Sequence, residues 1–226
     1  MAGENGRALI GISSDVLVCD GRERVGSYPA YAAAVVAAGG APVLLTHEVD
    51  SIAAIVDRLD GFILTGGDDP AVEAFAAVTD SRVTLVDPRR QGFEVALLEA
   101  LAEHKPDAPV LGVCLGMQMM ALTSGGVLDQ YLPDTPGLAD GHWEKQHAII
   151  GQDGWGFGDA NAVLSRHKQA VADAGSMRVV ARAPDGLIEA IDDPARRFCL
   201  GVQWHPERTD GREAGAAIFE ALVAAV

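Results

Sequence analysis

A cysteine between two glycines carries the strongest chemical signal in the sequence. Residues 112–116 read GVCLG, a G-x-C-x-G motif between an apolar run and a helical pattern. The glycines permit a turn so tight that side chains two positions from the cysteine would clash, and the turn lifts Cys114 above a sheet. There the positive end of a helix dipole and unpaired N–H groups favour the thiolate. The motif predicts a nucleophile; the alternative is a structural cysteine between packing glycines.

A thiolate nucleophile needs a base and a group that orients the base, and residues 201–207, GVQWHPE, offer both. An apolar strand delivers His205 to a sheet edge, and Pro206 holds it extended. Glu207, two residues on, then lies on the same side and can hydrogen-bond the imidazole. The alternative is a strand-terminal turn with an exposed glutamate. Because the cysteine motif accompanies this segment, we interpret Cys114, His205 and Glu207 as a catalytic triad.

A third segment, TGGDDP at residues 65–70, directly follows an apolar run. Its adjacent glycines, Gly66 and Gly67, expose a backbone N–H where parallel sheets bind ligands. With the N–H of Leu115 this makes two donors for the oxyanion of a tetrahedral intermediate. A plain Gly-Gly turn is the alternative.

Weaker signals come from other histidines and cysteines. His142, Glu144 and His147 could suggest a metal site, but their spacing is not H-E-x-x-H and no fourth ligand is evident, so we expect a polar loop and no metal. Cys199 lies in the last apolar run and is expected in the core. Cys19 has no neighbouring base.

The elements that must position these residues alternate along the first half of the chain. Apolar runs that predict strands cover residues 8–12, 42–45, 61–64 and 109–113, and helical patterns run from Pro29 to Gly39, from Ser51 to Leu59 and from Asp87 to Pro106. Ser27 is expected to cap the first helix. Strands that alternate with helices predict a parallel sheet covered on both faces.

Beyond residue 140 the pattern changes to short strands and turns. Asp185-Gly186 predicts a hairpin between strands at residues 177–183 and 187–191. Residues 198–204 predict the last strand, and residues 212–226 a closing amphipathic helix. No linker, repeat or low-complexity tract interrupts the chain, so we expect residues 1–226 to form a single α/β domain with a mainly parallel sheet.

Composition excludes several functional classes. The 226 residues include 32 acidic and 17 basic side chains, a formal net charge of −15, which disfavours nucleic-acid and anionic membrane partners. Three scattered cysteines predict neither a disulfide framework nor a zinc cluster. The first residues do not read as a signal peptide, and the two long uncharged stretches, 25–46 and 108–128, are interrupted by glycine and by proline or polar residues. We therefore expect a soluble, cytoplasmic protein.

Three segments carry a family resemblance. PVLGVCLGMQ, ILTGGDDP and LGVQWHPE resemble the class I (triad) glutamine amidotransferases. Within that superfamily AVVAAGGAPVLL, DPRRQGFEVALLEAL and the stretch from SRHKQAV to FCLGVQWHPE are similar to the γ-glutamyl-γ-aminobutyrate hydrolases. The resemblance implies a flavodoxin-like fold and cysteine-dependent hydrolysis of a small γ-glutamyl amide through a thioester, without metal or organic cofactor. It makes Cys114 the nucleophile, His205 the base, Glu207 its orienting acid, Gly67 and Leu115 the oxyanion hole, and Gly66, Gln118 and His167 substrate-binding residues.

The chain also departs from the hydrolase pattern. Leu115 stands where those hydrolases have arginine, and Lys168 stands in the N-S-x-H-H-Q motif. Arg90 and Glu94 fit the R-D-x-F-E pattern of those hydrolases, but Gln91 replaces its aspartate. Leucine after the nucleophile is commoner in ammonia-donating subunits, so the alternative function is a glutaminase subunit that serves a separate synthetase. The intact triad disfavours a catalytically silent binding protein. Arg166 and Lys168 either bind an anionic substrate group or are solvated surface, and the oligomeric state, including a homo-oligomer, stays open.

Overall fold

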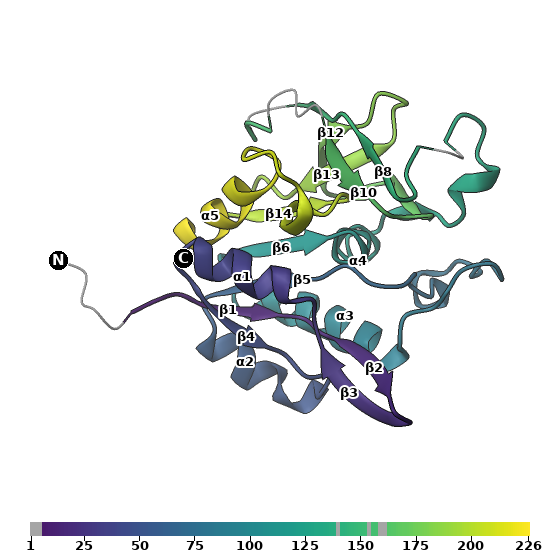
Figure 1. The fold of residues 1–226 in the computed structure, drawn as a ribbon. Coiled ribbons are helices and arrows are strands. Elements are labelled where there is room, and N and C mark those ends of the chain that lie inside the picture. Colours follow the sequence, from purple (N-terminus) through teal and green to yellow (C-terminus); the bar gives the residue numbers. More distant parts are fainter. Residues whose placement is uncertain (1–5, 139–140, 153–154, 158–161) are drawn as a thin grey trace.

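The central element of the fold is an eight-stranded sheet, seen in a computed structural model that describes residues 6–138, 141–152, 155–157 and 162–226 (Figure 1). Its strands follow the spatial order β4 (Ala41–Leu44), β1 (Leu9–Ile12), β5 (Gly61–Leu64), β6 (Val110–Val113), β14 (Cys199–Val202), β13 (Ile188–Asp192), β12 (Arg178–Arg182) and β9 (Ile150–Gly151). The first five run parallel to one another, and β13, β12 and β9 are added with antiparallel pairing. The expected mainly parallel α/β sheet is confirmed.

Register brings three strand ends to one place. Leu64 of β5 pairs with Gly112 of β6, and Val113 of β6 pairs with Val202 of β14. The carboxyl ends of these parallel strands therefore meet at the same sheet edge, where open α/β sheets bind ligands. The segments that follow these strands contain the candidate site residues. They are the glycine loop (residues 65–70), the cysteine turn around Cys114 (residues 112–116) and the His-Pro-Glu turn (residues 205–207).

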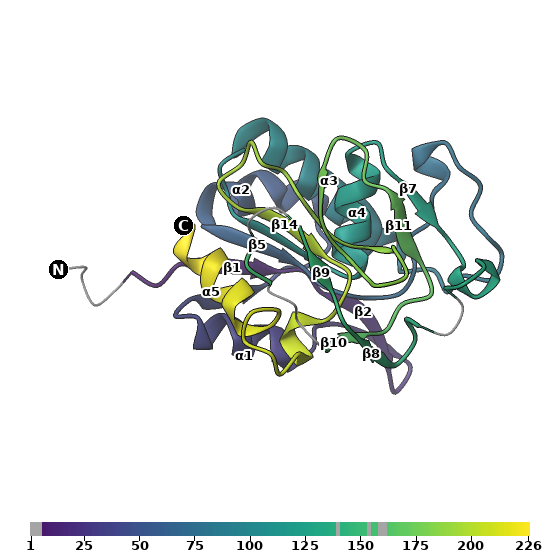
Figure 2. The same cartoon turned by 90° about the horizontal axis from the view of Figure 1, so that it is seen from above.

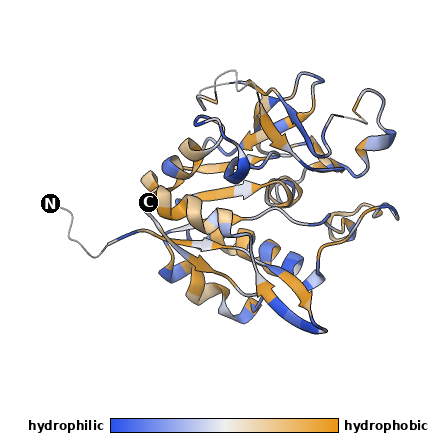
Figure 3. Cartoon of the chain, viewed as in Figure 1, coloured by the Kyte–Doolittle hydropathy of each residue, from blue (hydrophilic) through white to orange (hydrophobic). Residues whose placement is uncertain are grey.

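Helices cover both faces of the sheet (Figure 2). On one face α1 (Pro29–Ala37) and α5 (Ala216–Ala224) pack together, and on the other lie α2 (Ile52–Arg58), α3 (Pro88–His104) and α4 (Leu115–Thr123). Each face has its own apolar cluster, because the central strands are buried on both sides. Figure 3 shows hydrophobic residues along these strands, as expected for strands covered on both faces.

Among the described residues, three two-stranded sheets lie outside the central one. They are β2 (Asp15–Cys19) with β3 (Arg22–Gly26), β7 (Val127–Asp129) with β11 (Ala170–Asp173), and β8 (Lys145–His147) with β10 (Val163–Ser165). Short 3₁₀ turns cover Val49–Ser51, Glu73–Phe75, Leu132–Asp134 and Pro206–Arg208. The β2–β3 hairpin and the β8–β10 pair both lie at the end of the molecule toward which β6 points (Figure 1).

Local signals explain most element boundaries. Asp87 caps α3 by accepting a hydrogen bond from the Arg89 backbone N–H at 2.9 Å, and Gly186 (φ 94°) closes the predicted β12–β13 hairpin. Two expectations are wrong in detail. Tyr28, not Ser27, precedes α1, and it caps without a side-chain hydrogen bond. The closing helix begins at residue 216 rather than 212, because Gly215 (φ −123°, ψ −105°) is not helical.

No helix in the described part of the chain has the length and apolarity needed to span a bilayer.

Candidate active site

The cysteine turn places Cys114 between β6 and α4, as the N-cap of that helix. Its backbone adopts φ 51° and ψ −103°, a region that non-glycine residues rarely occupy and that costs on the order of 1–3 kcal/mol. Two backbone hydrogen bonds hold Cys114 in this strained conformation. Its N–H donates to the Val202 carbonyl at 2.8 Å, and its carbonyl accepts from the Gln118 N–H at 3.1 Å. The side chain is thereby fixed at a helix N-terminus.

Close packing explains both flanking glycines. A Cβ at Gly112 would lie 2.4 Å from the Met120 sulfur, and one at Gly116 would lie 2.3 Å from the Leu64 carbonyl oxygen. The cysteine turn therefore packs directly against β5. Any larger residue would push the cysteine away from the glycine loop that follows β5.

His205 and Glu207 form a buried pair after β14. Nδ1 of His205 lies 2.7 Å from Oε1 of Glu207, whose side chain is fully buried, and the His205 N–H donates to the Leu164 carbonyl at 3.0 Å. Burial alone would lower the pKa of His205, but its interactions with the Cys114 sulfur and the Glu207 carboxylate outweigh burial and raise that pKa to about 10. The site therefore stabilises a protonated imidazole beside the sulfur.

The glycine loop lies against the cysteine turn. A Cβ on Gly66 would be 3.5 Å from the Cys114 Cβ, and one on Gly67 would be 3.0 Å from Cδ2 of Leu115. The Gly66 N–H donates to the Tyr31 hydroxyl at 3.0 Å. Within the described residues the N–H groups of Gly67 and Leu115 have no hydrogen-bond acceptor. These two donors, rather than Gly66, are free to face an oxyanion.

Arg90 holds this loop from beneath. It is fully buried, pairs with buried Glu94 at 3.0 Å, and donates through Nη2 to the carbonyls of Thr65 at 2.7 Å and Gly66 at 3.2 Å. A Cβ at Gly67 would lie 2.5 Å from Arg90 Nη1. Sequence reasoning noted the pair only as part of a family pattern. The missed signal is an oppositely charged i,i+4 pair on the apolar face of a helix.

A buried amide also reaches the nucleophile and was not foreseen. Nε2 of Gln203, in the segment after β14, donates to the Cys114 sulfur at 3.5 Å. Gln118 donates in turn to Oε1 of Gln203 at 3.3 Å and to the Gln169 carbonyl at 3.2 Å. Gln118 therefore lines the same cavity as Cys114, with its amide nitrogen engaged by two protein acceptors, and its role in binding substrate stays a prediction. The available signal was a glutamine at the end of a buried apolar strand.

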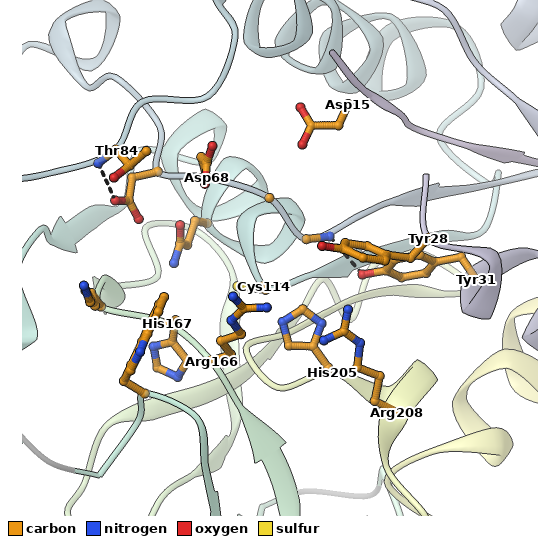
Figure 4. Close-up of a pocket in the computed structure, with 16 residues that line it drawn as sticks. Asp15, Tyr28, Tyr31, Asp68, Thr84, Cys114, Arg166, His167, His205 and Arg208 are labelled. Carbon is orange, nitrogen blue, oxygen red and sulfur yellow. Dashed lines mark hydrogen bonds between the residues drawn. The ribbon is translucent and has the colours of Figure 1, made fainter. Parts of the chain in front are cut away.

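These groups open into a cavity of about 210 Å³ (Figure 4). Its charged lining residues are Asp15, Asp68, Asp69, Arg166, Lys168 and Arg208. In Figure 4 the labelled acids Asp15 and Asp68 lie on the side opposite Arg166 and Arg208. Burial, followed by the charge of Asp15, raises the pKa of Asp68. The cavity thus offers one acidic and one basic wall.

Arg166 and Lys168, whose role the sequence left open, lie on the basic wall and are solvent-exposed there, so their binding of a substrate group stays a prediction. Both line the cavity, and both stack on Trp143, with Lys168 Nζ 4.4 Å and the Arg166 guanidinium 5.5 Å from its ring centre. Arg166 Nε also lies 3.7 Å from Glu144. His167, between them, lines the cavity too, but its Nδ1 lies 2.8 Å from the Gln169 carbonyl and its Nε2 faces Glu189.

The other two cysteines lie away from this arrangement. Cys199 is buried in β14, and burial raises the pKa of its thiol to about 11. Cys19 is half-buried in the β2–β3 hairpin. Of the three thiols, only Cys114 lines the cavity.

Comparison with known proteins agrees with this geometry. The sequence profile of the Peptidase C26 family matches residues 8–207. The γ-glutamyl-γ-aminobutyrate hydrolase of Escherichia coli O157:H7 is 30% identical over 86% of this chain and 84% of its own length. Protein NtpR of Enterococcus hirae is 34% identical over 78% of this chain and 79% of its own.

A similar fold is seen in a glutamine amidotransferase from Thermotoga maritima, with a TM-score of 0.62 at 15% identity over 90% of this chain and 77% of that one. The family profile covers most of the chain, from the first strand to the His-Pro-Glu turn. The chain therefore belongs to the Peptidase C26 family, whose fold is that of the class I glutamine amidotransferases.

Proposed function

We propose that this protein hydrolyses a γ-glutamyl amide to glutamate and a free amine. Membership of the Peptidase C26 family makes it a hydrolase of C–N amide bonds. The observation that carries the finer proposal is the alignment of Cys114, His205 and Glu207 beside two free backbone N–H groups. The similar γ-glutamyl-γ-aminobutyrate hydrolase supports the γ-glutamyl class.

The reaction proceeds in two halves. The Cys114 sulfur, its proton held by His205, attacks the γ-carbonyl carbon, and the C–N bond breaks as His205 gives its proton to the departing nitrogen. Water then gives a proton to His205 and its hydroxyl to the thioester carbon. The C–S bond breaks, glutamate leaves, and the proton returns to the Cys114–His205 pair.

Charge that develops on the carbonyl oxygen is stabilised by the N–H groups of Gly67 and Leu115. Removing one such donor from an acyl-transfer site costs on the order of 10²–10³ in kcat. Arg90 is a positioning residue in this scheme, because it holds the carbonyls of residues 65 and 66 and so aims the Gly67 N–H. Glu207 is also a positioning residue, because it holds Nδ1 of His205 and so orients the imidazole toward Cys114.

The two charged walls suit the two ends of such a substrate. Asp15 and Asp68 line the acidic wall and would pair with the α-ammonium of the glutamyl group, and Arg166 and Lys168 on the basic wall would pair with carboxylates. A leaving amine that itself bears a carboxylate gains contacts that ammonia lacks. Losing one or two such contacts costs about 1–3 kcal/mol each, or roughly tenfold to a hundredfold in kcat/KM.

The test is glutamate release from a panel of γ-glutamyl amides that includes glutamine and γ-glutamyl-γ-aminobutyrate, with Cys114→Ala as the blank. We expect at least about tenfold higher kcat/KM for an amide with a carboxylate-bearing amine than for glutamine. Equal or better cleavage of glutamine overturns the proposed substrate class while leaving the thiol chemistry in place.

One observation favours a second function. Leu115 occupies the position after the nucleophile, and its side chain contacts the Gly67 position. Leucine there fits a glutaminase subunit that passes ammonia to a separate synthetase. Such a subunit would prefer glutamine, act slowly alone and accelerate when its synthetase is added.

We also propose that the reaction takes place in the cytoplasm, where the free cysteines would stay reduced.

A further inference from the structure

Three histidines and a glutamate converge outside the triad, behind the basic wall of the cavity. They are His142, His147 at the end of β8, His167 after β10, and Glu189 in β13. One ligand atom from each lies within 4.8 Å of all the others. His142, His167 and Glu189 are at most 3% exposed, and the His147 side chain is 13% exposed.

The outward nitrogen of each ring is already engaged. Nδ1 of His147 lies 2.9 Å from the Ala148 carbonyl and Nδ1 of His167 lies 2.8 Å from the Gln169 carbonyl. Nε2 of His142 lies 2.8 Å from Oδ2 of Asp185. A carbonyl or carboxylate only accepts, so the proton sits on these outer nitrogens. This is how metal-binding histidines are commonly oriented, with the lone pair of the other nitrogen directed inward.

The inward atoms lack hydrogen-bond partners among the described residues. They are Nδ1 of His142, Nε2 of His147 and of His167, and both carboxylate oxygens of Glu189. Three lone pairs therefore face one buried anion. A buried charge or polar group left in this state is costly unless a cation completes it.

We infer that these four side chains form a binding site for a divalent transition metal of the zinc type. Oε1 of Glu189 lies 3.4 Å from Nδ1 of His142, 3.4 Å from Nε2 of His147 and 3.8 Å from Nε2 of His167. Bonds of about 2.0–2.1 Å in a tetrahedral site place neighbouring ligand atoms about 3.3–3.4 Å apart. Small side-chain rotations close the longer separations.

The ligand set also favours this class of ion. Imidazole nitrogens suit zinc, copper, nickel and iron, whereas calcium and magnesium prefer oxygen ligands. Four protein ligands fill a tetrahedral shell, as in a structural rather than a catalytic zinc site. The alternative occupant is a proton, which would turn one histidine into an imidazolium that donates to Glu189 and would leave the other lone pairs unpaired.

Sequence spacing concealed this cluster. His142 lies in a loop, as expected, but its side chain is buried there, whereas Glu144 is 64% exposed and takes no part. The two further ligands come from residues 167 and 189, which only the fold brings to His142 and His147. Because His167 lies between Arg166 and Lys168, a bound ion would brace the basic wall of the cavity. This inference holds whichever amide the enzyme cleaves.

The test is cobalt and zinc binding to the purified full-length chain after treatment with a chelator. We expect one Co²⁺ per chain with the visible d–d bands of a four-coordinate site, and loss of these bands when Zn²⁺ displaces the cobalt. Zinc at about a hundred times its Kd should raise Tm by about 5–10 °C. Glu189→Gln and His147→Ala should each abolish the cobalt bands and the Tm shift.

His104→Ala is the matched control, because His104 is exposed at the end of α3, and it should bind like the wild type. Far-UV circular dichroism of the metal-free variants separates loss of the site from loss of the fold, and Glu189→Gln keeps the shape of the side chain. A wild-type chain without bands or Tm shift would overturn the inference and leave a proton-sharing cluster. Four-coordinate bands that persist unchanged in Glu189→Gln would also overturn it.

Discussion

Glu207→Gln is the sharpest perturbation of the proposed triad, because it keeps the shape of the side chain and removes its charge. Oε1 of Glu207 lies 2.7 Å from Nδ1 of His205, and both groups are buried. A hydrogen bond to a charged partner contributes about 1.5–3 kcal/mol, against about 0.5–1.5 kcal/mol for a neutral one. The charge of Glu207 is therefore worth about 1–1.5 kcal/mol to the imidazolium.

That difference sets the expected changes. One pKa unit corresponds to about 1.4 kcal/mol, so the pKa of His205, about 10 in the wild type, should fall by about one unit. The same free energy lowers kcat/KM about tenfold. The glutamine amide can also donate to Nδ1 of His205 and shift its proton to the nitrogen that must serve Cys114, and a wrong tautomer costs up to about 10⁴-fold.

The assay is glutamate release by Glu207→Gln, Cys114→Ala and the exposed control Glu220→Gln, each checked by circular dichroism. We expect Glu207→Gln to lose between about 10- and 10⁴-fold and Cys114→Ala to lose all acyl transfer. Unchanged activity in Glu207→Gln would refute an orienting role. Loss as complete as that of Cys114→Ala in a folded protein would show that Glu207 does more than orient.

The stability of the folded protein should also depend on the protonation of His205. Because the pKa of His205 is raised to about 10 from an unfolded value of about 6.5, its protonation stabilises the fold fully below pH 6.5. That contribution is lost as the pH rises through 10. In Glu207→Gln the loss should be complete at lower pH, which Tm measured between pH 6 and pH 10 would detect.

Three further predictions rest on the same geometry. Iodoacetamide near neutral pH should alkylate Cys114 first, since it alone combines a helix N-terminus with His205, and faster labelling of Cys19 or Cys199, mapped by mass spectrometry, would contradict the assignment. Arg90→Met strands buried Glu94, so it should cost about 3–5 kcal/mol and lower Tm by about 6–20 °C, and adding Glu94→Leu should restore part of it; no recovery in calorimetry would argue against the pair. Replacing Arg166 and Lys168 with alanine should lower kcat/KM for a carboxylate-bearing amide and spare glutamine; equal loss for both would remove them from the amine side.

The sequence alone could predict the strands and turns that are determined by a few consecutive residues. Continuous apolar runs identified β1, β5 and β6, and parallel pairing then placed the ends of those strands together. The cysteine turn and the His-Pro-Glu turn are each defined by a few consecutive residues that follow an apolar run. Both turns could therefore be expected at the ends of neighbouring strands. Asp185-Gly186 likewise marked the β12–β13 hairpin.

The same turn signal was overlooked once. Asp20 (φ 52°) and Gly21 (φ 71°) join β2 to β3, and both adopt the positive φ that an Asp-Gly hairpin turn requires. The flanking strands are largely exposed, so they lack the alternation of buried and polar residues that marked other strands. The sequence pattern therefore indicated no strand in this segment.

Contacts between distant segments lay beyond the sequence. Arg90 meets the glycine loop, Gln203 meets the sulfur, and Glu189 meets three histidines only because strands separated by many residues become neighbours. Each is a polar group buried among apolar neighbours. A charged or amide side chain among buried neighbours thus signalled a tertiary partner but not which one.

The fold divides the proposed chemistry between its two halves. The attack on the carbonyl depends on the ends of parallel strands β5, β6 and β14, whose register fixes the glycine loop, Cys114 and His205 together. The basic wall comes mainly from the turn after β10, which carries Arg166 and Lys168, with Arg208 added from the segment after β14. Lys168, one of the departures from the hydrolase pattern, lies in that wall, whereas the triad residues match the pattern. Leu115, the departure next to Cys114, changes a side chain but keeps the backbone N–H that serves the oxyanion. Differences between this enzyme and its relatives should therefore concern which amine leaves rather than how the amide is attacked.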